Sequence, residues 1–358
     1  MRKKLVGMLT TATLLTMALA GNVQAAEIRS VGPDGEAAVD ASTIELTDEQ
    51  LEQVKEGGYT AAICLHYGGN DWSTSQQKGL EDTFGELGIE IVAVTDANFS
   101  AETQVSNIET VMAKKPDILV SIPTDATATA DAYKQAAAAG IKIIFMDQRA
   151  NGLEAGKDYV SVVSADNYGN GYASGTVLGD ALGGKGKVAM VYYDANFAPT
   201  NQRDEGFRDA MKNYPDIEIV TEQGFTDESG CAEQGDAILT QFPNIDGIYA
   251  SWDVPMEGVL SAVRAAGMEG KVTLACNDLG NNVAREIASG NIAGGGAQMP
   301  YDQGVAEAKL AALSLLGEET PSYVAVPAET VTHENVLEAY TDVYHVETPD
   351  WLKEAYVE

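Results

Sequence analysis

Apolar, strand-like runs alternate with helix-like runs from Tyr59 to about residue 316, and this alternation constrains the fold more than any other feature. The predicted strands cover 60–66, 89–94, 117–121, 141–146, 159–164, 187–193, 216–222, 246–250, 271–276 and 292–298. The predicted helices cover 74–87, 101–114, 126–139, 167–182, 202–214, 231–242, 254–266, 281–289 and 301–316. Such alternation is typical of parallel sheets with right-handed crossovers. So many units exceed one compact sheet, which predicts an α/β protein of two similar lobes.

Polar and aromatic residues gather where several of these strands end. The clusters lie at 65–72, 145–149, 250–253 and 275–278. In an open α/β sheet the carboxyl ends of the strands line the ligand crevice. Trp, Asp, Asn and Gln at these positions indicate that the protein holds a small polar molecule, and the pattern favours binding over catalysis.

The charge of the chain argues against nucleic acid as a partner. The 358 residues include 22 Lys and Arg against 54 Asp and Glu, a formal net charge of −32. Such a surface repels phosphate backbones. The hydrophobic content of 45% is ordinary for a soluble globular protein with a sizeable core.

Residues 1–25 have the pattern of an export signal. A basic start at 1–4 precedes an uncharged, apolar stretch at 5–20, and a small-x-small cleavage site follows at 23–25. The stretch is too short for a membrane span, and Asn22 stands where a lipidated protein needs cysteine. We therefore expect a periplasmic or extracellular protein that is soluble after the signal is removed.

Residues 26–57 are acidic and weakly patterned, which predicts a flexible leader that ends in one short helix. Thr47 is the expected N-cap of this helix, and Gln50 three residues later completes a capping box.

Motifs for catalysis, metals and cofactors are not found in the sequence. Cys64, Cys231 and Cys276 are interpreted as small buried hydrophobic residues rather than a disulfide framework. The three histidines lack zinc-site spacing. Residues 179–186 mimic a phosphate-binding loop, but Gly186 replaces the magnesium-holding Ser or Thr and the order of helix and strand is reversed. We expect no cofactor, no metal and no enzymatic activity, although the many carboxylates leave a glycosidase-type pair formally open.

Seven segments carry a resemblance to a known family: 78–81, 122–126, 139–147, 163–171, 201–207, 246–253 and 297–304. Their order and spacing across roughly residues 58–330 resemble the ribose-binding-protein-like, type I solute-binding components of sugar ABC transporters. The resemblance implies two Rossmann-like lobes with parallel sheets, joined by a three-crossing hinge. Lobe one is expected at 58–164 plus 299–328, and lobe two at 165–298 plus 329–358. A monomer of this kind closes on its ligand and presents it to a membrane permease.

The resemblance also implies ligand contacts at six matched positions. They are the amide Asn70, the stacking aromatic Trp72, the carboxylates Asp147 and Asp278, the lobe-two arginine Arg203, and the hinge amide Gln298. Apolar ring faces need an aromatic cover, and each desolvated hydroxyl needs a polar partner.

Five further positions depart from a ribose pocket and are also predicted to bind ligand. His66 replaces a small hydroxyl residue, and Trp252 replaces an amide, with Asp253 beside it as a possible substitute. Asn277 replaces an aromatic residue, and Gln148 replaces a basic one. The predicted ligand is therefore a sugar or polyol whose identity stays open.

Each prominent site residue has a structural alternative. Trp72 and His66 are also compatible with a core or lobe-interface role, and Asp147 and Asp278 with caps of the helices that follow them. Arg203 is compatible with a structural salt bridge across the cleft.

Other functions compatible with this fold are a ligand-loaded receptor for chemotaxis or signalling and an extracytoplasmic enzyme. A transcriptional regulator is set aside because an export signal and an acidic leader stand where a basic helix-turn-helix is needed.

Overall fold

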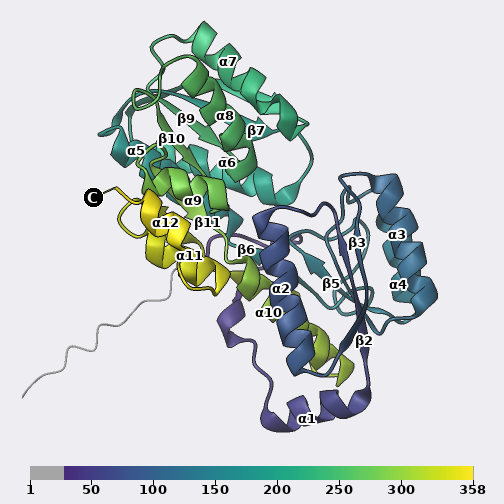
Figure 1. Cartoon of the computed structure of the whole chain (residues 1–358). Coiled ribbons are helices and arrows are strands. Elements are labelled where there is room, and N and C mark those ends of the chain that lie inside the picture. The colour runs from purple at the N-terminus through teal and green to yellow at the C-terminus, as the bar shows by residue number, and fades with distance from the viewer. Residues whose placement is uncertain (1–27, 358) are drawn as a thin grey trace, which may run out of the picture.

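Two largely parallel sheets, one in each lobe, form the framework of the molecule (Figure 1). The computed structural model describes residues 28–357. Buried apolar side chains pack on both faces of each sheet, beneath the helices. The predicted α/β architecture of two lobes is confirmed.

Lobe one holds a seven-stranded sheet in the order β1-β12-β6-β5-β4-β2-β3, with every neighbouring pair parallel. Its strands are β1 (Val39–Asp40), β2 (Thr60–Leu65), β3 (Glu90–Asp96), β4 (Ile118–Ser121), β5 (Lys142–Met146), β6 (Ser161–Ala165) and β12 (Tyr323–Val326). Its helices are α1 (Asp48–Gly57), α2 (Asp71–Glu86), α3 (Ala101–Lys114), α4 (Ala130–Ala138) and α10 (Pro300–Leu315).

Lobe two holds a six-stranded sheet in the order β13-β11-β10-β9-β7-β8, in which only the edge strand β13 is antiparallel to its neighbour. Its strands are β7 (Lys185–Tyr193), β8 (Asp216–Phe225), β9 (Gly247–Ala250), β10 (Thr273–Cys276), β11 (Gly294–Ala297) and β13 (Glu329–Thr332). Its helices are α5 (Asn167–Ala181), α6 (Ala198–Met211), α7 (Cys231–Gln241), α8 (Asp253–Ala265), α9 (Asn281–Ala288), α11 (Val336–Tyr344) and α12 (Asp350–Ala355).

The chain crosses between the lobes three times. It passes from β6 to α5, from β11 to α10, and from β12 to β13. These crossings form the predicted hinge. Because α10 returns to pack on α2, lobe one is built from two distant parts of the sequence.

Local sequence patterns define several helix ends. The Thr47 hydroxyl accepts from the Gln50 backbone N–H, and the Gln50 side chain accepts from the Thr47 N–H, which completes the predicted capping box of α1. Gly88, Gly140 and Gly267 follow α2, α4 and α8 with φ of 69°, 87° and 66°. A left-handed residue at these positions costs little only for glycine.

The leader is ordered between residue 28 and α1, so the prediction of a flexible segment is wrong there. The backbone N–H groups of Arg29 and Ser30 donate to the Asp166 carboxylate at 3.0 and 2.8 Å. Asp34 pairs with Arg149 at 2.7 Å, and β1 extends the sheet of lobe one. These contacts hold the segment against the hinge region.

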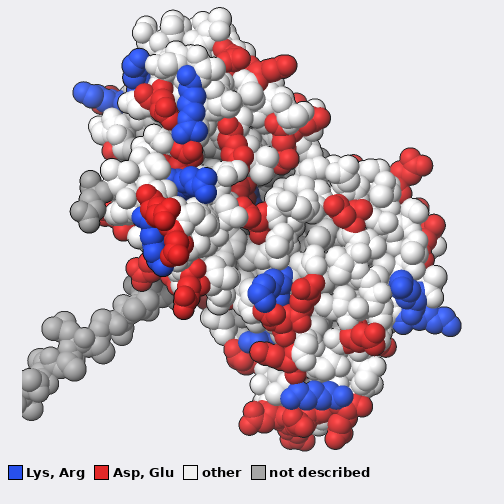
Figure 2. Space-filling model, in the orientation of Figure 1, with Lys and Arg blue, Asp and Glu red and all other residues white. Residues whose placement is uncertain are grey.

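The three cysteines are buried and unpaired in the described part of the chain, as predicted. Burial raises the pKa of the Cys64 thiol to about 11, so this thiol stays protonated and unreactive at neutral pH. Acidic side chains are spread over the visible face of both lobes, with fewer basic ones among them (Figure 2). The predicted export signal at 1–25 lies outside the described residues. Among the helices described, none has the length and apolar character needed to cross a bilayer.

Candidate ligand-binding site

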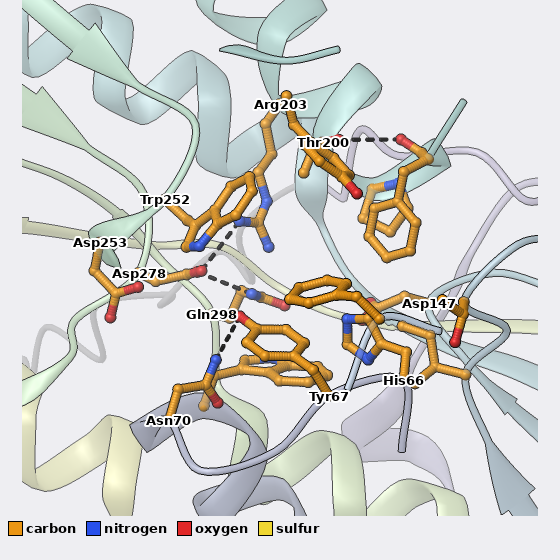
Figure 3. A pocket seen from close by; sticks show the side chains of 17 residues that line it. His66, Tyr67, Asn70, Asp147, Thr200, Arg203, Trp252, Asp253, Asp278 and Gln298 are labelled. Atoms are coloured by element: carbon orange, nitrogen blue, oxygen red, sulfur yellow. Dashed lines mark hydrogen bonds and ion pairs between the residues drawn. The ribbon is translucent and has the colours of Figure 1, made fainter. Parts of the chain in front are cut away.

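A cavity lies between the lobes, with walls from both lobes and the hinge (Figure 3). The cavity faces the carboxyl ends of β2, β5, β9 and β10, which places the polar clusters at these strand ends around a common space. The predicted residues that line it are His66, Asn70, Trp72, Asp147, Arg203, Trp252, Asp253, Asp278 and Gln298.

Gln148 and Asn277 do not line the cavity, contrary to the prediction. Asn277 is fully buried, and its side-chain N–H groups donate to the Tyr249 hydroxyl at 2.8 Å and to the Ser251 carbonyl at 2.9 Å. Gln148 donates to the Pro123 carbonyl at 2.9 Å. Both side chains are satisfied by protein groups and support the wall from behind.

Arg203 projects from α6 into the cavity (Figure 3). Its Nε donates to Asn167 Oδ1 at 2.9 Å, and its Nη1 donates to Asp278 Oδ2 at 3.0 Å and to the Ser251 carbonyl at 3.2 Å. The ion pair with Asp278 lies within lobe two, so it does not bridge the cleft. Burial opposes the charged guanidinium, but Asp278 and Asp147 raise the pKa of Arg203 above its ordinary value. The fork is therefore charged and held in place, and its Nη2 has no hydrogen-bond partner among residues 28–357.

Asp147 and Asp278 reach the cavity through an unusual backbone conformation. Their φ angles are 54° and 68°, in the left-handed region that Asp tolerates better than most residues. Asp147 accepts from Ser164 Oγ at 2.9 Å, and Asp278 accepts from Gln298 Nε2 at 2.9 Å. Neither carboxylate caps a following helix. Backbone strain of this kind concentrates at binding sites, where it fixes the direction of a functional group.

Asp253 is a carboxyl group whose ionisation has little support from its surroundings. It is buried, and its only described bond is from the Val254 N–H at 2.8 Å. Burial, and then the nearby Asp278 carboxylate, raise the pKa of Asp253 well above its usual range. Burial likewise raises the pKa of Asp147. Both groups gain from hydrogen-bond donors, which a hydroxylated ligand supplies.

Aromatic rings form much of the remaining wall. His66 stacks against Phe197 with ring centroids 5.7 Å apart and meets Trp72 edge-on at 5.8 Å. Burial lowers the pKa of His66 to about 3, so the ring is neutral and contributes as a flat, polar-edged surface. Trp72 belongs at the same time to the hydrophobic cluster of lobe one.

Sequence reasoning missed the other residues of the wall: Tyr67, Phe99, Ile122, Thr124, Tyr193, Phe197, Pro199 and Thr200. Two of them carry a signal that was overlooked. Tyr67 follows His66 in the same loop, and Tyr193 is the last residue of β7, a position equivalent to the strand ends that supplied the predicted residues.

Comparison with known proteins places this geometry in a family. Residues 61–319 match the family model described as periplasmic binding protein domain. The D-ribose/D-allose-binding protein of Pseudomonas aeruginosa is 29% identical over 273 residues, which cover 73% of this chain and 83% of that protein. The ribose import binding protein of Bacillus subtilis is 26% identical over 213 residues, or 59% of this chain and 67% of that protein.

Solved structures agree with the family match. An ABC transporter periplasmic solute-binding protein from Actinobacillus succinogenes with bound D-allose is 29% identical, with a TM-score of 0.72 over 78% of this chain and 99% of that chain. A solute-binding protein from Agrobacterium vitis bound with α-D-tagatopyranose is 26% identical, with a TM-score of 0.74 over 82% and 100%. The family model, the relatives and the two-lobed fold agree, and the chain belongs to the periplasmic binding protein family.

Proposed function

We propose that this protein captures a sugar or polyol between its two lobes and delivers it to an ABC permease. The observation that carries the proposal is a group of buried polar atoms on the cavity wall that lack a partner among the described residues. They are His66 Nδ1, Trp72 Nε1, Thr124 Oγ1 and Gln298 Oε1. A buried polar atom without a hydrogen bond costs about 1–3 kcal/mol. The hydroxyl groups of a ligand satisfy such atoms when the lobes close.

The chemistry of the walls fits a sugar ring. Aromatic faces cover the apolar C–H surface of a sugar, while Asp147, Asp253 and Asp278 accept hydrogen bonds from its hydroxyls. Arg203 offers donors to the hydroxyl or ring oxygens. The carboxylates outnumber the single guanidinium, which disfavours anionic ligands such as sugar acids.

The relatives support the transport role. They include a ribose import binding protein and two ABC transporter solute-binding proteins, whose structures hold D-allose and α-D-tagatopyranose. The export pattern in residues 1–25 supports a place outside the cytoplasm. We further propose that the protein acts as a monomer, because one chain supplies both walls of the cavity. We also propose that it performs no catalysis, because the features of the cavity derived above serve to hold a ligand.

The first prediction is that a neutral monosaccharide or polyol binds the mature protein. Isothermal calorimetry against pentoses, hexoses and polyols should give a saturable heat for at least one compound. Sugar acids and amino acids serve as charged comparisons and should give none. Binding of only these charged compounds would contradict the proposed function.

A further inference from the structure

Two side chains of lobe one reach across the cleft to the first residues of two helices in lobe two. Asp71 Oδ2 accepts from the Asn281 backbone N–H at 2.7 Å, and Asp71 Oδ1 accepts from Asn281 Nδ2 at 2.8 Å. Gln148 Oε1 accepts from the Ala198 backbone N–H at 3.2 Å. Asn281 begins α9, and Ala198 begins α6.

Neither of these helices receives a side-chain cap from its own N-cap residue. Gly280 precedes α9 and Phe197 precedes α6, and neither provides such a bond. The first N–H groups of a helix have no partner within the helix and need one from elsewhere. Lobe one therefore supplies a cap that each helix lacks, whereas α2 is capped within its own lobe by Asn70.

The residue before α9 is shaped for this contact. A Cβ on Gly280 would lie 2.1 Å from Asp253 Oδ2 and 3.3 Å from Asp71 Oδ2. A side chain at position 280 would therefore displace the Asp253 carboxylate and press against that of Asp71. Asp71 itself does not line the cavity, but its neighbours Asn70 and Trp72 do.

We propose that Asp71 and Gln148 are closure latches, which cap α9 and α6 of lobe two only while the lobes are closed. The inference rests on the proposed capture of a ligand by closure. Opening the cleft separates the lobes, so these bonds are exchanged for bonds to water. The latches thus hold the closed form and slow ligand release without touching the ligand, which makes them positioning residues.

Asp71→Ala and Gln148→Leu test the latches through the dissociation rate of the tightest-binding compound of the sugar and polyol panel. The loss of a helix cap predicts that each variant releases ligand about fivefold faster, and the double variant about 25-fold faster if the sites are independent. The association rate should stay near that of the wild type. Glu102→Ala is the matched control, because it removes a first-turn carboxylate of α3 that does not cross the cleft.

A substitution in lobe two distinguishes the loss of the contact between the lobes from a local disturbance of lobe one. Asn281→Pro removes the N–H that Asp71 accepts, at a helix position that suits proline. Gly280 has φ −55° and ψ 155°, which the residue before a proline adopts readily. Asn281→Pro should speed release as Asp71→Ala does, and combining the two should add little.

Unchanged release from the Asp71→Ala, Gln148→Leu double variant would overturn the latches, and so would fully additive effects of Asp71→Ala and Asn281→Pro. Such results would leave the proposed function intact if the wild type binds a sugar or polyol. If the wild type binds none, small-angle scattering of the ligand-free proteins still tests the latches. Loss of the two latches should then give the double variant a larger radius of gyration than the wild type, and equal radii would overturn the proposal.

Discussion

Arg203→Met should weaken ligand binding by about 30- to 1,000-fold, which corresponds to ~2–4 kcal/mol. The variant removes the charged fork that faces the cavity and leaves the Asp278 carboxylate without its cation. A buried hydrogen-bonded charge at the centre of an interface is a typical site of such losses. Calorimetry with the cognate compound measures the loss directly.

Two companion variants separate binding from folding. Arg203→Lys keeps a positive charge near Asp278 but loses the planar fork, so it should bind between wild type and Arg203→Met. Adding Asp278→Asn to Arg203→Met removes the unpaired buried charge, so it should restore the melting temperature without restoring affinity. If this double variant recovers wild-type affinity as well, Arg203 has no direct role in holding the ligand.

The architecture was predictable from the sequence because its main elements are long and periodic. Every βα unit expected between residues 60 and 316 is present in the structure. The strands and α-helices that were not predicted are short or late in the chain: β1, β12, β13, α11 and α12. β4, β9, β10 and β11 are equally short, but each lies between two helices that the sequence predicts, whereas β1, β12 and β13 lack a helix on at least one side. The place of such a strand is decided by the neighbour with which it pairs.

Site residues at the ends of strands were predictable from the sequence. The sequence did not predict which of two adjacent residues faces the cavity, because local backbone geometry decides this. Asp147 and Gln148 are adjacent, as are Asn277 and Asp278, yet only the Asp of each pair faces the cavity. The left-handed φ of each Asp turns its carboxylate in and places its neighbour elsewhere. The expectation that residues at strand ends line the site selects both members of such a pair, because the sequence pattern contains no information on φ.

The prediction of a flexible leader was wrong for a related reason. Acidic, weakly patterned sequence is typical of disorder, but residues 29 and 30 are ordered by backbone N–H groups that donate to Asp166. Backbone donors are the same in every residue except proline, so no composition reveals them. This segment also lies outside the 61–319 match to the family model.

One buried carboxyl of lobe one is poorly placed to carry a charge. Glu307 of α10 is fully buried, its Oε1 accepts from Gln76 Nε2 at 2.6 Å, and its Oε2 has no partner among the described residues. Burial raises the pKa of Glu307 well above its usual range, and the Asp147 carboxylate adds to the effect. Gln76 Oε1 and Gln303 Oε1 are also unpaired, so the surroundings offer spare acceptors, which suits a proton on Glu307.

Glu307→Gln should therefore stabilise the protein at pH 8 by about 1–3 kcal/mol and change little near pH 4. Because the pKa of Glu307 is higher in the folded than in the unfolded state, the unfolded chain releases this proton first as pH rises above about 4.5. Native stability falls over that interval until the folded group also ionises. Glutamine keeps the bond from Gln76 and has no proton to release, so this loss of stability disappears.

Melting curves of wild type and variant should converge at acid pH and separate at alkaline pH. The control Glu109→Gln, an exposed change on α3, should follow wild type throughout. A gap between Glu307→Gln and wild type that does not depend on pH would mean that Glu307 is not held protonated.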